Sequence, residues 1–152
     1  NMNWLYNGRE ITDISQFPPN TFGFVYQVIT PEGKKYVGKK VLYHNQKKKL
    51  TKAELAEQTG RGRKKSYKII QKESDWKKYI GSNVKLKNQI TEGEVTKEDL
   101  KKQILEIGLN KKHLTYLETK YLFQMEVLEN PDQYYNDNIL GKFFTSDFDS
   151  QI

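Results

Sequence analysis

The sequence of 152 residues contains no cysteine, only four prolines and no long apolar run. Without cysteine the chain can form neither a disulfide nor a thiolate metal site, so its stability has to come from packing. No segment approaches the roughly 20 consecutive apolar residues of a membrane-spanning helix, and no basic start leads into an apolar signal segment. We therefore expect one soluble, unsecreted protein of the cytoplasm.

The basic residues gather in one part of the chain. The chain has 26 lysines and arginines in total and 19 aspartates and glutamates, which gives a net charge of +7. Residues 34–87 hold sixteen lysines and two arginines against four acids, whereas the rest has eight bases and fifteen acids. Such asymmetry suits a polyanion and favours nucleic acid as the partner, although a lysine-rich solvated face gives the same pattern. A membrane partner is not expected, because the basic segment lacks a long amphipathic helix.

The composition divides the chain into three parts. Residues 1–21 form an N-terminal arm, residues 22–136 a domain with a basic insertion at 44–72, and residues 137–152 a C-terminal tail. Within the insertion, Thr51 followed by Glu54 predicts a capped short helix over residues 51–57. The remainder of this lysine-rich stretch is expected to stay mobile until an anion orders it.

Hydrophobic patterns predict the elements of the main domain. Residues 22–29 (FGFVYQVI), a turn at 30–33 and an extended stretch at 35–38 predict a β-hairpin. Ser82 is expected to cap a helix over residues 83–90. Residues 96–107 fit either a helix or a strand. Apolar residues spaced by three and four predict a helix over residues 110–129, ended by the sequence Asn-Pro-Asp.

Glu118 falls inside the apolar stripe of this last helix, between Leu117 and Leu122. A carboxylate on a buried face needs a partner, because burying an unpaired charge is costly. That partner is either a tyrosine hydroxyl or a neighbouring lysine, such as Lys111, Lys112 or Lys120, or else a divalent cation. Mg²⁺ is typically bound by one or two carboxylates plus water and phosphate, so a single glutamate suffices in a phosphodiesterase.

Tyr26 and Tyr36 both lie in the predicted hairpin, where antiparallel pairing places them on a shared face. Packing is the ordinary role of such a pair. A phenol near lysines can also act as a general base through a lowered pKa. Charge on the transition state of a phosphoryl reaction would then be stabilised by a nearby cation, for which the candidates are Lys39, Lys40, Arg61 and Arg63.

Five short motifs occur in a fixed order along the chain. They are WLYNG at residues 4–8, GFVY at 23–26, YVG at 36–38, SDWKKYIGS at 74–82 and YN at 135–136, with Glu118 before the last. In this order they resemble the GIY-YIG nuclease superfamily, and more closely its small phage-encoded members. The resemblance covers residues 4–136. Phe24 stands where the first motif has glycine.

The resemblance implies a small α/β (α+β) domain with a three-stranded antiparallel sheet flanked by helices, and therefore a strand near residues 102–107. It implies a Mg²⁺-dependent DNA endonuclease, with Mn²⁺ as an alternative metal, that leaves a 5′-phosphate and a 3′-hydroxyl. Tyr26 would be the base that activates water and Tyr36 an orienting phosphate contact. Glu118 would be the metal ligand, and Asn136 a supporting or phosphate-contacting residue.

The family's catalytic arginine follows the second motif, where this chain has only lysines before Arg61. Arg61, Arg63, Lys39 or Lys40 would have to replace it, and lysine offers a point charge in place of a planar fork. A monomer or a dimer would bind double-stranded DNA through Lys47, Lys48, Lys49, Arg61, Arg63, Lys64, Lys65, Trp76, Lys77, Lys78, Tyr79 and Ser82. The alternatives are a non-catalytic basic nucleic-acid-binding protein and a module that binds an acidic protein.

Overall fold

The computed structural model describes residues 2–60 and 62–148. The chain forms two compact units. The first, here called the core unit, consists of Asn1–Leu42 and Asp75–Ile152, and the second, called the ribbon unit, of Tyr43–Ser74. None of the helices in the described residues is long and apolar enough to cross a membrane.

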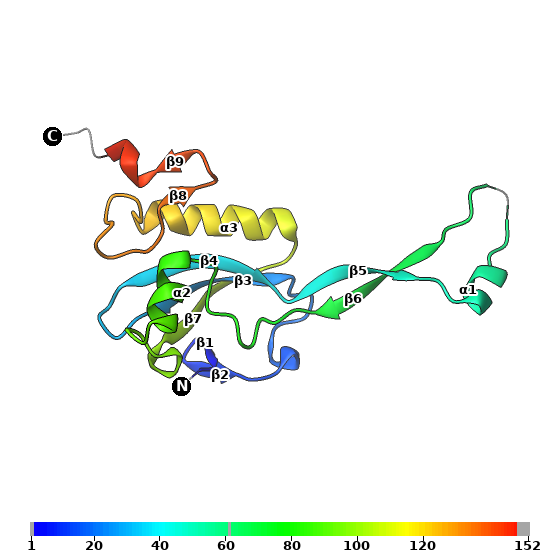
Figure 1. The fold of residues 1–152 in the computed structure, drawn as a ribbon, viewed down its shortest axis with the longest axis horizontal. Coiled ribbons are helices and arrows are strands. Elements are labelled where there is room, and N and C mark those ends of the chain that lie inside the picture. Colours follow the sequence, from blue (N-terminus) through cyan, green and yellow to red (C-terminus); the bar gives the residue numbers. More distant parts are fainter. Residues whose placement is uncertain (1, 61, 149–152) are drawn as a thin grey trace. The chain divides into compact units, whose positions relative to one another are not determined.

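A five-stranded sheet forms the centre of the core unit, with the strand order β2-β1-β7-β3-β4 (Figure 1). The strands are β1 (Trp4–Tyr6), β2 (Arg9–Ile11), β3 (Gly23–Ile29), β4 (Lys35–Val41) and β7 (Lys101–Gly108). β1 is parallel to β7, and the other pairs are antiparallel. The α+β class, the hairpin and the strand near residues 102–107 are confirmed. The expected number of three strands is wrong, because the N-terminal arm folds into a hairpin of its own and adds β1 and β2 to the sheet edge.

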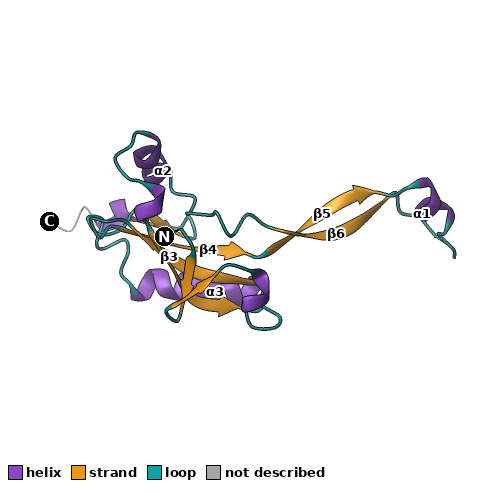
Figure 2. Ribbon diagram, turned by 90° about the horizontal axis from the view of Figure 1, so that it is seen from below, coloured by secondary structure: helices purple, strands orange, loops and turns teal. Residues whose placement is uncertain are grey.

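The sheet is covered on both faces, which explains why β3 is apolar along almost its whole length. On one face α3 (Lys111–Gln124) packs against β3, β4 and β7 (Figure 1). Val25 and Val37 point into this layer and meet Leu114 and Leu117 of the helix. In Figure 2, α3 lies on the opposite side of the β3–β4 hairpin from α2 (Val84–Thr91).

Aromatic rings fill the other face of the sheet. Trp4 contacts Phe24 and Tyr26 edge-on, with ring centroids 5.0 and 5.1 Å apart, and Phe17 packs between Phe24 and Trp76. The Trp4 indole donates a 2.6 Å hydrogen bond to the Trp76 carbonyl. Trp76 is therefore a fully buried core residue and not a contact to DNA, which corrects the role expected from its place in a basic segment.

The two predicted helices of the core unit are present with different ends. Asn83, and not Ser82, caps α2, because the Asn83 side chain accepts a hydrogen bond from the Leu86 amide. α3 begins after the Asn110 cap and ends at Gln124, five residues earlier than predicted. Glu126 has φ +54°, so the chain turns there. Val127 and Leu128, which follow it, are buried but belong to a loop and not to the helix.

The remaining short elements of the core unit lie at the edges. They are the 3-10 turns η1 (Ile14–Gln16), η2 (Lys97–Asp99) and η3 (Thr145–Phe148) and the hairpin of β8 (Asn138–Ile139) with β9 (Phe143–Phe144).

The ribbon unit contains regular strands where the sequence predicted secondary structure only over residues 51–57. β5 (Tyr43–Lys49) pairs antiparallel with β6 (Tyr67–Glu73) over seven residues. The predicted short helix is confirmed as α1 (Lys52–Ala56), with Thr51 and Glu54 forming the capping box. The sequence did not predict these strands. Both faces of the ribbon are exposed to solvent, so its residues do not alternate between apolar and polar side chains as they do in a half-buried strand.

Lys102 is a buried lysine in β7, with 1% of its surface exposed. Its ammonium donates to the Lys77 carbonyl at 3.1 Å and lies 4.3 Å from the centre of the Trp4 ring. Burial, reinforced by Lys97, lowers its pKa to about 8. The folded state therefore carries the cost of a buried charge below about pH 8.

We expect Lys102→Met to raise the free energy of unfolding at pH 7 by about 1 kcal/mol, since the apolar side chain carries no charge into the core. At pH values between about 8 and the unfolded pKa of ~10.4, Lys102 holds its proton in the unfolded wild type and has released it in the folded wild type. The wild type therefore gains stability with rising pH, and the difference between the proteins shrinks. Urea unfolding at pH 7 and pH 9 measures this, and a constant difference would contradict it.

Candidate active site

Tyr26 and Tyr36 lie on the same face of the β3–β4 hairpin. Tyr26 is opposite Gly38 and Val28 is opposite Tyr36, so the two tyrosines are diagonal neighbours. Their ring centroids are 6.3 Å apart. Tyr26 is 1% exposed, whereas Tyr36 is half-buried and its hydroxyl is 3.1 Å from the Ser82 hydroxyl. The predicted sharing of a face by the two phenols is confirmed.

Two glycines give the tyrosine rings their space. A Cβ atom at Gly38 would lie 2.6 Å from the Tyr26 hydroxyl and 3.1 Å from the Tyr36 ring. A Cβ atom at Gly81 would lie 2.9 Å from the Tyr36 ring and 3.4 Å from the Tyr26 hydroxyl. Gly81 also has φ +104°, a conformation that other residues rarely adopt. The glycines of the YVG and YIGS motifs thus keep the surroundings of the phenols open.

The pKa values of both phenols are raised. Burial is the main cause for Tyr26, whose pKa lies well above the usual 10.0, with further contributions from Tyr36 and Tyr79. Burial also raises the pKa of Tyr36, although the hydrogen bond with Ser82 opposes the change. The expectation that lysines lower a phenol pKa here is wrong, because burial and the neighbouring phenols and carboxylates raise both pKa values and no lysine among the described residues offsets them. Both phenols therefore carry their protons at neutral pH.

Glu118 reaches the same region from α3. Its side chain is 20% exposed, and one carboxylate oxygen lies 4.0 Å from the Lys39 ammonium. Burial raises the pKa of Glu118, and Lys39 lowers it to a smaller extent. Lys39 lies opposite Val25 on the face that α3 covers, and it also donates to the Thr115 hydroxyl at 2.9 Å. Lys39 is thus the lysine that pairs with Glu118, in place of the helix lysines that the sequence suggested.

A cleft of about 530 Å³ brings these groups together. Its lining includes Tyr36 and Ser82 from the tyrosine face, Glu118 from α3, and Asn136 and Asp137 from the segment after α3. No hydrogen bond joins the Glu118 carboxylate to another residue among those described. The cleft therefore offers phenol, hydroxyl and carboxylate oxygens.

These oxygen donors fit a magnesium ion that is only partly held by protein. Among the described residues there is no group of three or more histidines, aspartates or glutamates that would hold a metal without other ligands. Mg²⁺ keeps several waters and commonly takes one or two carboxylates plus substrate phosphates. Glu118, with Asp137 on the same cleft, matches that requirement.

Lys40 points to the opposite face from Lys39, because neighbouring residues of a strand alternate. Its ammonium lies 2.6 Å from an Asp75 carboxylate oxygen and 4.0 Å from the centre of the Tyr79 ring. Tyr79 in turn contacts Tyr26 edge-on at 6.0 Å. Lys40 therefore packs behind the tyrosine pair, so Lys39 is the better placed of the two lysines to act in the cleft.

Asn136 holds the outer edge of β4. Its side-chain oxygen accepts from the Val37 amide at 3.0 Å, and its side-chain nitrogen donates to the Val37 carbonyl at 2.8 Å. Asn136 is 8% exposed and Val37 only 1%. The side chain therefore takes the place of a neighbouring strand and fixes β4 directly beside Tyr36 and Gly38.

We expect Asn136→Ala to lower the free energy of unfolding by about 2–3 kcal/mol, because two buried backbone groups of Val37 lose their partners. Cleavage should fall further than stability explains, since β4 carries Tyr36, which lines the cleft, and Lys39, which lies beside Glu118. Asn88→Ala, at an exposed asparagine with no side-chain hydrogen bond among the described residues, is the matched control. Denaturant unfolding provides the comparison, and equal small losses in the two variants would contradict the bracing role.

The remaining predicted residues fall into three groups. Ser82 and Tyr79 lie at the tyrosine pair, and Lys77 and Lys78 are exposed nearby in the sequence. Arg63 belongs to the ribbon unit, and Arg61 lies outside the described residues. The other predicted DNA contacts, namely Lys47, Lys48, Lys49, Lys64 and Lys65, also belong to the ribbon unit and are exposed.

Two acids of the site were missed from the sequence. Asp137 follows the YN motif and lines the cleft, and Asp75 forms the ion pair with Lys40. The sequence offered one signal, since Asp75 lies within the SDWKKYIGS motif and Asp137 directly after the YN motif. That position alone does not distinguish a site residue from an ordinary surface aspartate.

Comparison with known protein families identifies the family of this chain. A family described as "Putative endonuclease segE, GIY-YIG domain" matches residues 4–139. This span contains both motif tyrosines, Glu118 and Asn136, and covers most of the 152 residues. The chain belongs to this GIY-YIG endonuclease family. The curated proteins and the solved structures give no match.

Membership makes the chain a GIY-YIG nuclease by family, with nucleic acid as its substrate class. In this GIY-YIG chain the two motif strands are β3 and β4, and the late glutamate lies on α3, which covers the opposite face of the same hairpin. The motifs therefore meet at the β4 side of the sheet, beside the cleft.

Proposed function

We propose that this GIY-YIG protein is a Mg²⁺-dependent endonuclease that hydrolyses double-stranded DNA. Its closer resemblance to the small phage-encoded members of the superfamily points to a phage as its source. The observation that carries the proposal is the Glu118 carboxylate, which lines the same cleft as the Tyr36 phenol and has Lys39 at 4.0 Å. A half-buried carboxylate whose pKa is raised by burial costs stability, so its presence favours a functional role.

Glu118, with Asp137 on the same cleft, would hold the metal. Bound Mg²⁺ supplies a Lewis acid that polarises the phosphate and stabilises charge on the leaving oxygen. Lys39 adds a fixed positive charge next to Glu118 and is proposed to replace the family's arginine. The core unit contains a single arginine, Arg9, which lies in β2 at the far edge of the sheet from β4.

Tyr36 is protonated at neutral pH and lines the cleft, so it is suited to donate a hydrogen bond to a phosphate oxygen. Tyr26 lies one ring deeper. Its phenol is proposed to lose its own proton to solvent, and the resulting phenolate then takes the proton of the attacking water. The water oxygen bonds to phosphorus while the P–O3′ bond breaks, and the leaving 3′ oxygen takes up a proton from solvent. The products are a 5′-phosphate and a 3′-hydroxyl.

The test is supercoiled plasmid incubated with the purified protein and Mg²⁺, beside an identical reaction with EDTA. Nicked and linear products are separated on a gel, and their ends are tested with ligase. We expect metal-dependent breaks that ligase reseals, since resealing requires a 5′-phosphate and a 3′-hydroxyl. Breaks that persist in EDTA would contradict the metal dependence, and ends that resist ligase would contradict the chemistry.

Two observations favour a second function. A lysine stands where the family has arginine, and both phenols are protonated. The chain therefore has the features of a basic DNA-binding protein without cleavage activity. Salt-sensitive binding without breaks in either Mg²⁺ or Mn²⁺ would favour that function.

A further inference from the structure

The net charge of the chain resides in the ribbon unit. Residues 43–74 contain eight lysines and two arginines against three glutamates, a balance of +7 that equals the charge of the whole chain. The core unit has sixteen basic and sixteen acidic residues and is neutral. Electrostatic attraction to a polyanion therefore acts on the ribbon unit more than on the unit with the cleft.

The two faces of the ribbon differ in chemistry. Because directly opposed residues share a face, the register places His44, Lys48, Lys68 and Lys72 on one side together with Gln46 and Ile70. The other side carries the pairs Tyr43–Glu73, Asn45–Gln71, Lys47–Ile69 and Lys49–Tyr67. We call the second side the amide face, because Asn45 and Gln71 stand directly opposite each other on it.

The amide face presents groups that folding does not use. Asn45 and Gln71 are exposed, and neither side chain has a hydrogen bond to another residue in the described part of the chain. Ile69, on the next pair along the same face, is 55% exposed. Asparagine and glutamine form paired hydrogen bonds with the major-groove edge of adenine, and apolar side chains contact the thymine methyl group.

The dimensions of the ribbon suit the major groove. A two-stranded ribbon has strands about 5 Å apart, and its seven residues extend about 23 Å. The major groove is about 12 Å wide and admits such a ribbon, whereas the minor groove is about 6 Å wide. Successive pairs on one face lie about 7 Å apart, close to the rise of two base pairs.

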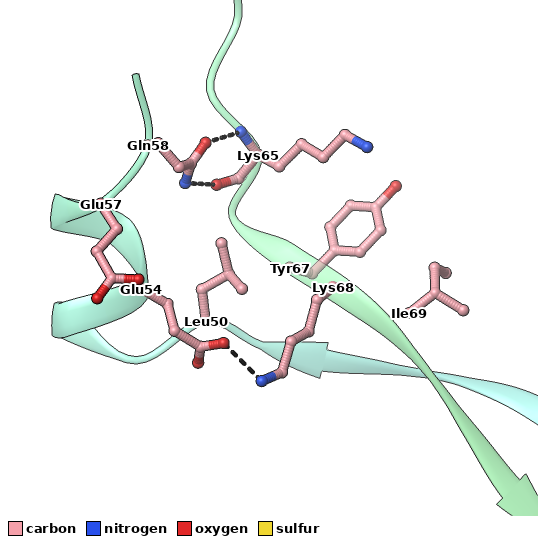
Figure 3. Close-up of a pocket in the computed structure, with 8 residues that line it drawn as sticks. All are labelled: Leu50, Glu54, Glu57, Gln58, Lys65, Tyr67, Lys68 and Ile69. Atoms are coloured by element: carbon pink, nitrogen blue, oxygen red, sulfur yellow. Dashed lines mark hydrogen bonds and ion pairs between the residues drawn. The ribbon is translucent and has the colours of Figure 1, made fainter. Parts of the chain in front are cut away.

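The tip of the ribbon is held in a defined conformation. Gln58 accepts a hydrogen bond from the Lys65 amide at 2.8 Å and donates one to the Lys65 carbonyl at 2.6 Å (Figure 3). Lys68 pairs with Glu54, whose pKa is lowered to about 2, mainly through that hydrogen bond (Figure 3). Lys47 lies 4.5 Å from the centre of the Tyr67 ring. The Lys47–Tyr67 contact joins the two strands, and the other contacts hold Glu54 and Gln58 against residues 65–68.

We propose that the ribbon unit enters the major groove of duplex DNA with its amide face toward the bases, where Asn45 and Gln71 read an adenine and Ile69 contacts a neighbouring thymine methyl group. Lys48 and Lys72, on the opposite face, extend to the flanking phosphates. This inference rests on the proposed DNA-cleaving function, because it assigns target choice to the ribbon and the chemistry to the cleft.

The first experiment compares two double variants with the wild type. Asn45→Ala/Gln71→Ala leaves the charge unchanged, whereas Lys48→Ala/Lys72→Ala removes two charges from the other face. Plasmid DNA is cut by each protein and the ends are mapped by sequencing. We expect the wild type to prefer an adenine at a fixed distance from the cut by about tenfold, and the amide variant to lose that preference. The lysine variant should keep it but bind with a salt slope lower by about two.

The second experiment needs no cleavage. Duplexes methylated with dimethyl sulfate are mixed with the protein in EDTA, and bound and free fractions are separated. Methylation at guanine N7 blocks the major groove, and methylation at adenine N3 blocks the minor groove. We expect interference at guanine N7, and interference confined to adenine N3, or none, would overturn the inference.

An amide variant that keeps the wild-type cutting pattern, or a wild type that cuts without base preference, would also overturn the inference. If the wild type cuts no DNA at all, the proposed function fails, and the methylation experiment still decides whether the ribbon binds in the major groove.

Discussion

A Glu118→Gln protein should retain less than about one thousandth of the wild-type cleavage rate, measured on supercoiled plasmid with Mg²⁺. The substitution keeps the size of the side chain and removes the negative charge that we propose to hold the metal. Lys39 would then lie beside a neutral amide in place of the carboxylate oxygen at 4.0 Å. A glutamine oxygen is a weaker metal ligand, so adding more Mg²⁺ should not restore the rate.

The loss should not come from unfolding. Burial raises the pKa of Glu118, so folding disfavours its ionised form, and the wild type carries this cost at pH values above that pKa. Glu118→Gln should therefore have a melting temperature equal to or above that of the wild type at pH 7. The advantage should disappear at low pH, where the wild-type carboxyl group is also neutral.

Glu129→Gln is the matched control, because Glu129 is an exposed carboxylate shortly after the same helix. It should cut at the wild-type rate. Binding to duplex DNA in EDTA should be similar in all three proteins, since the charge of the ribbon unit is untouched. Substantial cleavage by the Glu118→Gln protein would show that its carboxylate is not required, and the proposed metal site would be wrong.

Gly38→Ala should lower the cleavage rate about a hundredfold or more and the free energy of unfolding by about 2 kcal/mol. The new methyl group would lie 2.6 Å from the Tyr26 hydroxyl and 2.9 Å from the ring carbon that bears it. The Tyr26 ring cannot move aside easily, because Trp4, Phe24 and Tyr79 contact it. The strain would therefore fall on the tyrosine pair and on β4, which carries Tyr36 at the cleft.

A second substitution separates the two effects of Gly38→Ala. Tyr26→Phe removes the hydroxyl group that collides with the methyl group, so Tyr26→Phe/Gly38→Ala should regain part of the lost stability. It should not regain activity, because the proposed base is absent. Urea unfolding and plasmid cleavage of the single and double variants give the comparison. If Gly38→Ala is both stable and active, the tyrosine pair has more free space than the structure shows.

Local patterns predicted much of the core unit. The hairpin of β3 and β4 was predicted from aromatic and β-branched residues around a turn, and α3 from its apolar spacing. The strand at residues 101–108 was ambiguous by pattern, because β7 is buried on both faces and shows no clean alternation. The resemblance to a known family resolved it. The hairpin of the N-terminal arm was missed, since its strands have only three residues each.

Two features of the site could be predicted from the repeat of a single element: Glu118 lies on an apolar helix face, and Tyr26 and Tyr36 share a face of a hairpin. The concentration of basic charge in one segment is likewise a property of the sequence. Which groups meet depends on tertiary packing. It placed Lys39 beside Glu118, joined Asn136 to Val37 and buried Trp76, because these contacts join residues far apart in the chain. It also decided the raised pKa values of the phenols, since desolvation depends on what packs around a group and not on its neighbours in sequence.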